Sequence, residues 1–164
     1  MDRVEQTEKK NYIKIRGIEY LGEEDTAQKV IELANTVQVT IRKEDFTCYR
    51  LGKPDKVSRP ILVKLHNQHK KIELMRAKKN LANAAAGKFI EEDLTKLRSK
   101  LYYEVRKDEN TTKHWTIEGK IYAMVTPRSG GEATKACFQT PDDLAVLGWD
   151  DDRIENFMNT INTT

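Results

Sequence analysis

Residues 59–93 constrain the fold more than any other part of this chain. They begin with a short apolar run, residues 61–65, in which Ile61, Val63 and Leu65 share one side. A helix-forming segment at about 68–81 follows, and residues 88–90 have the character of a second short strand. This order predicts a strand–helix–strand unit that is followed by an acidic helix start at 91–93.

Upstream segments extend this unit. Residues 12–18 alternate strictly, with Ile13 and Ile15 on one side, which predicts a half-buried strand. A helix opening at 22–26 and a β-rich run at 46–51 come next. The order strand, helix, strand, strand, helix, strand predicts an α+β protein with a ferredoxin-like βαββαβ domain, of the RNA recognition motif (RRM) type, at about 11–91.

The remaining residues predict a small α+β domain at 92–148. Asp93 or Thr95 can cap a helix that runs to about Lys107. A hairpin with the turn Glu118-Gly119, a third strand at 133–139 and a helix start at Thr140-Pro141 follow. Residues 1–10 are interpreted as a lead-in, the end of a coiled coil or a linker. Residues 149–164 are expected to form an acidic and polar tail that frays.

Charge is distributed unevenly along the chain. Residues 1–113 hold 25 Lys and Arg against 18 Asp and Glu, whereas residues 114–164 hold 4 against 8. Between residues 60 and 80 there are six cationic side chains and one acid, Glu73. Basic residues that recur on consecutive elements favour a surface that contacts phosphates, although any single helical lysine fits a solvated face equally well.

The candidate nucleic-acid-binding residues come from at least four consecutive elements. Tyr12 is the one aromatic expected to stack on a base, because residues 59–65 hold no aromatic and no K/R-G-F/Y signature. Binding should therefore depend on phosphate contacts and be weakly sequence-specific. The complete set is Tyr12, Lys14, Arg16, Arg50, Lys53, Arg59, Lys64, Lys70, Lys71, Arg76, Lys78, Lys79, Arg98 and Arg106.

No catalytic constellation is evident, so no enzymatic activity, metal or cofactor is expected. His66 and His69 have no further ligands at a suitable spacing. The acids at 91–93 fit a helix N-terminus better than a metal-dependent nuclease, which is the weakest alternative. No phosphate-binding glycine loop is present.

The two cysteines and the hydropathy bear on the cell compartment. Cys48 and Cys137 lie far apart in sequence, which favours two reduced thiols in an intracellular protein. No apolar run approaches the roughly 18 residues of a membrane span, so no membrane association is expected. A cytoplasmic or nuclear location is predicted.

Several strings resemble, in order and spacing, the first-open-reading-frame proteins of LINE-type non-LTR retrotransposons. These are VEQ at 4–6 with NYIKIRGI at 11–18, YRLGK at 49–53, RPILVK at 59–64 and FIEEDLT at 89–95. Residues 115–122, a strand and TPDDL at 140–144 resemble the C-terminal domain of the baculovirus few-polyhedra (FP) protein, which recurs in transposon-derived animal proteins. The resemblance covers most of residues 3–148.

The resemblance implies an RNA-binding protein that coats its transcript in a ribonucleoprotein and acts as a nucleic-acid chaperone. In that family the RRM and C-terminal domains clamp single-stranded RNA, and an upstream coiled coil drives trimerisation. Carried onto this chain, the clamp implies roles for Arg50, Arg59, residues 70–79 and the helix at 95–107. Single-stranded RNA, or single-stranded DNA, is the expected partner, with homo-oligomerisation through an upstream coiled coil in the full-length protein.

The chain departs from that family in two respects. It contains no sustained heptads, so trimerisation cannot be assumed for these residues. Its C-terminal strands are poor in basic residues, with only Lys120, Arg128 and Lys135. The alternative function is therefore a protein–protein adaptor domain of a domesticated transposon-derived or FP-like protein.

Overall fold

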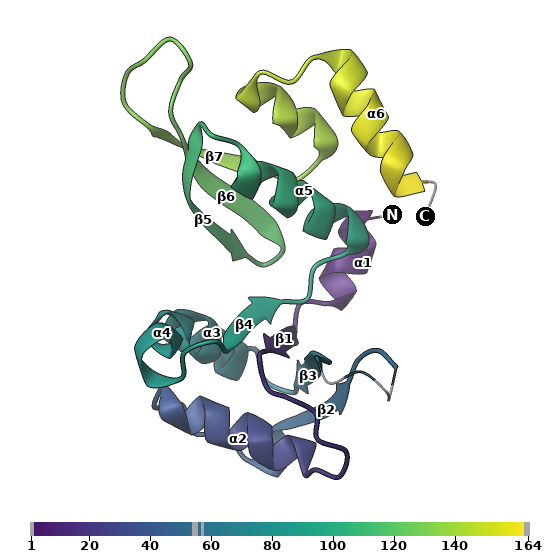
Figure 1. Cartoon of the computed structure of the whole chain (residues 1–164), viewed down its shortest axis with the longest axis vertical. Helices are drawn as coiled ribbons and strands as arrows, with labels where there is room; N and C mark the ends of the chain where they lie inside the picture. Colours follow the sequence, from purple (N-terminus) through teal and green to yellow (C-terminus); the bar gives the residue numbers. More distant parts are fainter. Residues whose placement is uncertain (1, 54–55, 57, 163–164) are drawn as a thin grey trace. The chain divides into compact units, whose positions relative to one another are not determined.

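The computed structural model describes residues 2–53, 56 and 58–162. The chain has α+β architecture and divides into two compact units (Figure 1). The first unit comprises residues 9–93, and the second comprises the N-terminal residues to Glu8 together with the chain from Leu94 onward. Each unit has its own antiparallel sheet and its own apolar core.

A four-stranded sheet organises the first unit. Its strands are β1 (Tyr12–Arg16), β2 (Phe46–Arg50), β3 (Ile61–Leu65) and β4 (Phe89–Glu92), in the spatial order β2-β3-β1-β4. All neighbouring strands are antiparallel. Ile13 pairs with Val63 on one side and with Glu92 on the other, so β1 lies at the centre of the sheet.

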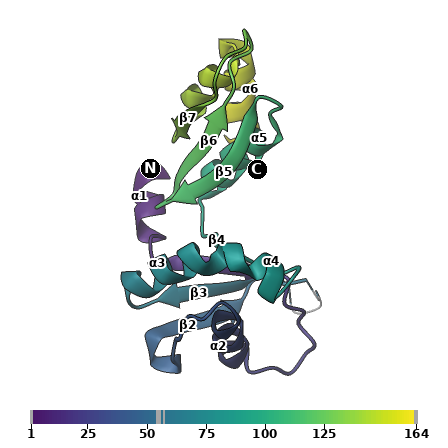
Figure 2. The same ribbon diagram turned by 90° about the vertical axis from the view of Figure 1, so that its left-hand side faces the viewer.

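Helices α2 (Thr26–Thr36) and α3 (Gln68–Ala77) pack on one face of this sheet (Figure 2). Asp25 caps α2, because its carboxylate accepts a hydrogen bond from the Gln28 amide at 3.1 Å. Short helical turns also occur at η1 (Lys43–Asp45), η2 (Lys78–Asn80) and α4 (Leu81–Ala84). The core joins the inward side chains of the strands to Val30, Leu33 and Leu74 of the helices.

The inward face of α3 differs from the one predicted. The apolar pattern of residues 68–81 predicts that Ile72, Leu74, Met75 and Leu81 face inward, but Ile72 is 38% exposed, whereas Lys71 is buried. The reason is electrostatic: Glu92, at the inward-facing end of β4, is buried and needs a cation, and the Lys71 ammonium lies 2.9 Å from its carboxylate. The small residues at 80–87 predict a weakly structured segment, but it contains helix α4, in which Leu81 lies in the core.

A three-stranded sheet organises the second unit, with β5 (Thr111–Ile117), β6 (Lys120–Val125) and β7 (Thr134–Phe138) in that order. The predicted two-residue turn joins β5 to β6: Glu118 and Gly119 have φ of 50° and 79°, as a hairpin of this length requires. Helix α5 (Lys96–Lys107) lies across one face of the sheet, and Leu101, Ile121 and Phe138 lie in the core.

The chain after Thr140 begins as predicted and then departs from the prediction. η3 (Pro141–Leu147) has a capping box at Thr140 and ends at Gly148, whose φ is 88°. The expected frayed tail is wrong, because residues 151–162 form helix α6 (Asp151–Asn162). Its buried Ile154 and Phe157 join the core, and Phe157 meets Trp149 edge to face at 6.0 Å between ring centroids.

The N-terminal residues form a helix that belongs to the second unit. In α1 (Asp2–Glu8) the side chain of Gln6 is buried and accepts a hydrogen bond from the Thr95 amide at 2.9 Å. The Asp2 carboxylate accepts from the Thr95 hydroxyl at 2.5 Å and pairs with Arg98 at 2.8 Å. Within the segment interpreted as the end of a coiled coil or a linker, residues 2–8 thus form a helix that is fixed to the start of α5. No helix in the described part of the chain is long and apolar enough to cross a membrane.

Candidate nucleic-acid interface

The face of the four-stranded sheet opposite the helices, called the open face below, gathers aromatic and cationic side chains. The alternation of β1 places Tyr12, Lys14 and Arg16 there, as predicted, because Ile13 and Ile15 point into the core. Strand register sets Lys64 beside Tyr12 on the neighbouring strand. The open face consists of Tyr12, Lys14, Arg16, Thr47, Tyr49, Leu62, Lys64, Phe89 and Glu91.

Two exposed aromatics of the open face were missed by the sequence analysis. Tyr49 on β2 and Phe89 on β4 are each 58% exposed, while Tyr12 on β1 is half-buried. The signal was available in the alternation, because Phe46 points inward and Tyr49 lies three residues later. Three of the four strands therefore offer an aromatic ring, where the sequence analysis expected only Tyr12.

The three cationic side chains of the open face differ in whether they form an ion pair. Lys64 is exposed, and its ammonium lies 5.8 Å from the centroid of the Tyr12 ring. Lys14 pairs with Asp93 at 3.4 Å, and Arg16 pairs with Glu91 at 3.1 Å. No ion pair is found for Lys64 among the described residues, so its charge is the most available one on this face.

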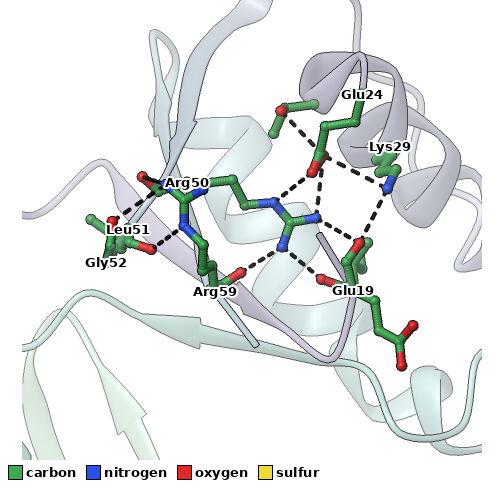
Figure 3. Close-up of polar contacts among 9 residues, drawn as sticks. Glu19, Glu24, Lys29, Arg50, Leu51, Gly52 and Arg59 are labelled. Carbon is green, nitrogen blue, oxygen red and sulfur yellow. Dashed lines mark hydrogen bonds and ion pairs between the residues drawn. The ribbon is translucent and has the colours of Figure 1, made fainter. Parts of the chain in front are cut away.

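Arg50 does not belong to the interface, although the sequence analysis placed it there. Its side chain is 4% exposed, and Figure 3 shows its guanidinium enclosed by acceptors. Nε and Nη2 donate to the Glu24 carboxylate at 3.0 and 3.2 Å, and further donations go to the backbone carbonyls of Ile18, Glu19 and Arg59. All five N–H groups are used, so Arg50 organises the loop before α2 and cannot reach a phosphate.

Arg59 braces the connection between β2 and β3. Its Nε donates to the Leu51 carbonyl at 3.0 Å, and its Nη2 donates to the carbonyls of Arg50 and Gly52 at 3.4 Å (Figure 3). Its guanidinium also lies 4.7 Å from the centroid of the Tyr20 ring. The side chain is half-buried, so its main role in the structure is to hold this connection, on which Lys53 is exposed.

The basic residues around α3 do not lie on the open face, because α3 packs on the opposite side of the sheet. Lys71, which the sequence predicts to bind RNA, is 5% exposed, pairs with Glu92 and donates to the Lys10 carbonyl, so its ammonium is not on the surface of this structure. Lys70 donates to the Thr40 carbonyl at 3.0 Å. The other predicted residues around α3 are Arg76 and Lys79, which are exposed, and Lys78, which is half-buried.

Arg98 and Arg106 belong to the second unit. Arg98 is 5% exposed and is held by Asp2 and by the Gly119 carbonyl at 2.7 Å, so it is a structural residue and not a phosphate ligand. Arg106 is exposed, and its guanidinium lies 4.6 Å from the Tyr102 ring centroid. The fourteen predicted residues therefore do not form a single surface.

The acids at 91–93 are not a helix start, which corrects the prediction. Glu91 and Glu92 end β4 and point to opposite faces of the sheet, and the buried Asp93 pairs with Lys9 at 3.1 Å. Helix α5 begins later, where Thr95 accepts a hydrogen bond from the Arg98 amide. No group of three or more His, Cys, Asp or Glu side chains arranged for a metal ion occurs among the described residues.

The other residues singled out for chemistry have ordinary surroundings. His66 Nδ1 lies 3.0 Å from the Glu44 carbonyl, and His69 is exposed at the start of α3. Both cysteines are free. Burial, aided by the nearby carboxylates of Asp25 and Glu24, raises the pKa of the Cys48 thiol, so it stays protonated at neutral pH.

No protein-family model matches this chain, and a search of curated proteins returns no significant match. The functional assignment therefore depends on the chemistry of the open face.

Proposed function

We propose that the first unit is an RRM-like domain and that its open face binds single-stranded nucleic acid, RNA first, without enzymatic turnover. The strand order β2-β3-β1-β4, with helices on one face, is the order expected for a ferredoxin-like βαββαβ domain. In such domains the uncovered face of the sheet stacks unpaired bases on aromatic side chains. The open face has this composition.

The observation that carries the proposal is the exposure of Tyr49 and Phe89 on the same face as Tyr12 and Lys64. Large aromatic side chains that stay exposed to solvent do not contribute to the folding of the core. A stacked base would cover them and remove their apolar surface from water. Stacking is worth roughly 1–3 kcal/mol per base and is tolerant of sequence, because every base has a π-face. Three rings on three strands can receive successive unstacked bases.

Charge supports the same partner. Residues 9–93 contain 18 Lys and Arg against 12 Asp and Glu, a net charge of +6 from a chain whose total is +3. Lys64 lies beside the Tyr12 ring, where an ammonium can contact the phosphate of a base stacked there. Arg16 can exchange its partner Glu91 for a phosphate at a modest cost in free energy, because both side chains of this ion pair are about half-exposed. Lys14 can make the same exchange only by leaving Asp93.

Within this proposal the protein coats RNA as a ribonucleoprotein component of retrotransposon type and acts as a nucleic-acid chaperone. Weak sequence preference follows from stacking and phosphate contacts, and this suits a protein that covers a whole transcript. Homo-oligomerisation through an upstream coiled coil would add avidity, because linked sites bind the same strand at a high effective concentration.

The test is fluorescence anisotropy with a labelled single-stranded RNA of about 25 nucleotides, with DNA and duplex controls. Tyr49→Ala and Phe89→Ala should each weaken binding about 5- to 150-fold, as expected from losing one stacked base. Tyr103→Ala is the matched control, because Tyr103 is 56% exposed on α5 of the other unit. Unchanged affinity in both open-face variants would reject this face as the binding surface.

A salt series examines the electrostatic part. Lys64→Ala should reduce the slope of log K against log salt concentration by about 0.7, the value for one phosphate contact on a single strand. Lys79→Ala, on the other side of the sheet, should leave the slope unchanged. A salt dependence that weakens only in Lys79→Ala would indicate that the RNA phosphates contact the side of the sheet covered by α3.

A further inference from the structure

Strand β7 forms an edge of the three-stranded sheet in the second unit. It pairs with β6 alone among the described residues, so the N–H and C=O groups of its other side have no strand partner. An edge of this kind is a template on which an extended segment of another chain can add as a further strand. Its side chains decide which segment fits.

Lys135 is the second of the five residues of β7 and lies on the face away from the core. Register places it beside Met124, while Ala136 and Phe138 point to the opposite, apolar side. Its ammonium lies 5.0 Å from the centroid of the Tyr122 ring, and Tyr122 stacks on Trp115 at 5.7 Å with 14° between the planes. The Lys135 ammonium is therefore held on the outer face of the sheet by the Tyr122 ring of the neighbouring strand β6.

The outer face of this sheet is cationic and carries no carboxylate on its strands. Lys120 and Lys135 are both exposed on it, and Ile117 is 54% exposed. The outer-face residues with assigned register are Thr112, Trp115, Ile117, Lys120, Tyr122, Met124, Lys135 and Cys137. An incoming strand would thus meet positive charge on one side and the apolar Ala136 side on the other.

We propose that the β7 edge docks an extended acidic segment of a partner protein, which adds to the sheet as a strand. Its alternate residues would be Asp or Glu on the outer side, near Lys135, and aliphatic on the inner side, next to the half-buried Ala136. The proposal is independent of RNA binding by the first unit. It gives the second unit an adaptor role.

Charge and ring geometry favour this occupant over the alternatives. The second unit carries 11 Lys and Arg against 14 Asp and Glu in residues 1–8 and 94–164, and this net charge opposes a long polyanion such as a nucleic acid. A short acidic segment needs only the local positive charge of Lys120 and Lys135 on the outer face. Tyr122 is flanked by Trp115 and by the Lys135 ammonium, so its ring is already engaged. A second copy pairing through the same edge would bring lysines of like charge together.

The experiment titrates the full chain into two labelled peptides of about ten residues, one alternating Glu with Val and one alternating Lys with Val. The acidic peptide should bind and the basic one should not. Lys135→Glu should weaken the acidic peptide at least about tenfold and create binding of the basic one. Lys107→Glu on α5, whose side chain is 53% exposed, provides the same charge change away from the edge.

Backbone methylation tests strand addition directly. Successive N–H groups of a strand point to opposite edges, so methylating alternate amides blocks one edge of the peptide and spares the other. Of the two alternately methylated acidic peptides, one should lose binding and the other should keep it. The proposal would be overturned if the two methylated peptides bound equally well, or if the unmethylated acidic and basic peptides did. It would also be overturned if single-stranded RNA displaced the acidic peptide from this edge.

Discussion

At the scale of single residues, burial separates the arginines and lysines of this chain into structural and available groups. Arg50, Lys71 and Arg98 are all at most 9% exposed, and each is held by a carboxylate and by backbone carbonyls. Lys64 is exposed and has a ring, not an acid, as its described neighbour. The same residue types therefore perform opposite tasks, and the difference lies in their partners.

Arg50→Ala should destabilise the protein and not act as a selective binding mutation. The change would remove the closer of the two cations beside the Glu24 carboxylate, which is 3% exposed, and would leave only Lys29 at 3.7 Å. It would also remove one donor from each of the carbonyls of Ile18, Glu19 and Arg59. Breaking a buried pair on one side costs about 3–5 kcal/mol. Urea unfolding measures this loss, and Arg42→Ala, an exposed arginine of the same unit, should stay within about 0.5 kcal/mol of the parent.

His114 should make the stability of the protein depend on pH. Burial, and secondarily the charge of Arg106, lowers the pKa of His114 below its ordinary 6.5. The Thr111 hydroxyl donates to a backbone carbonyl, Val105 at 2.6 Å or Asp108 at 2.9 Å, so it accepts from the His114 Nε2–H at 2.8 Å, which defines the neutral tautomer.

The sign follows from proton counting. The unfolded chain takes up a proton at His114 as the pH falls through 6.5, and the folded chain does so only at lower pH. Unfolding free energy should therefore decline as the pH falls through this interval and level off below the folded pKa. The His114→Gln variant should lose less stability than the parent between about pH 7.5 and pH 5.5 in thermal melts. Equal losses would contradict the assignment.

The sequence predicts features that depend on neighbouring residues, such as the face on which a side chain lies, but not contacts between residues far apart in the chain. Alternation in residues 12–16 places Tyr12, Lys14 and Arg16 on one face, and the same rule applied to 46–50 would have found Tyr49. Nothing local reveals that Arg50 meets Glu24, 26 positions earlier, or that Arg98 meets Asp2, 96 positions earlier. Periodicity gives the face of a residue, whereas its partner depends on tertiary structure.

At the scale of secondary-structure elements, the two helices that the sequence analysis misjudged both owe their position to tertiary contacts. The register of α3 is set by the Lys71–Glu92 pair, which overrides the apolar preference of Ile72. α6 has acids in its first turn, an ordinary helix signal, but its acidic and Asn/Thr-rich composition suggested a tail. Its two buried side chains, Ile154 and Phe157, were too few to stand out.

The contribution of α6 to the core can be measured with a pair of adjacent variants. Phe157→Ala should cost about 3–5 kcal/mol, because the ring is 8% exposed and packs edge to face on Trp149. Met158→Ala, whose side chain is 43% exposed on the same helix, should cost much less. Guanidinium unfolding followed by Trp fluorescence distinguishes them, and equal effects would mean that α6 contributes no core packing.

At the scale of the whole molecule, the two units have net charges of opposite sign, and this favours the first unit as the site for a long polyanion. The unit of residues 9–93 carries +6, and the remainder of the chain carries −3. If the first unit binds RNA as proposed, long-range attraction acts on this unit, and short-range contacts select where on it the RNA is bound. The open face and the basic residues around α3 (Arg76, Lys78 and Lys79) lie on opposite sides of the sheet. A single RNA strand would therefore follow one of these two surfaces.

Lysine reactivity in the full-length chain decides between these two surfaces. The protein is treated with an acylating reagent with and without single-stranded RNA, and modification is quantified at each lysine by mass spectrometry. Lys64, exposed beside Tyr12 on the open face, should become protected, whereas Lys79, exposed among the basic residues around α3, should keep its reactivity. Because both lysines share one chain and one reaction, differences in fold stability or RNA affinity affect them equally. Protection of Lys79 without Lys64 would place the RNA on the helices, where the absence of stacking rings would make binding wholly electrostatic and correspondingly steeper in salt.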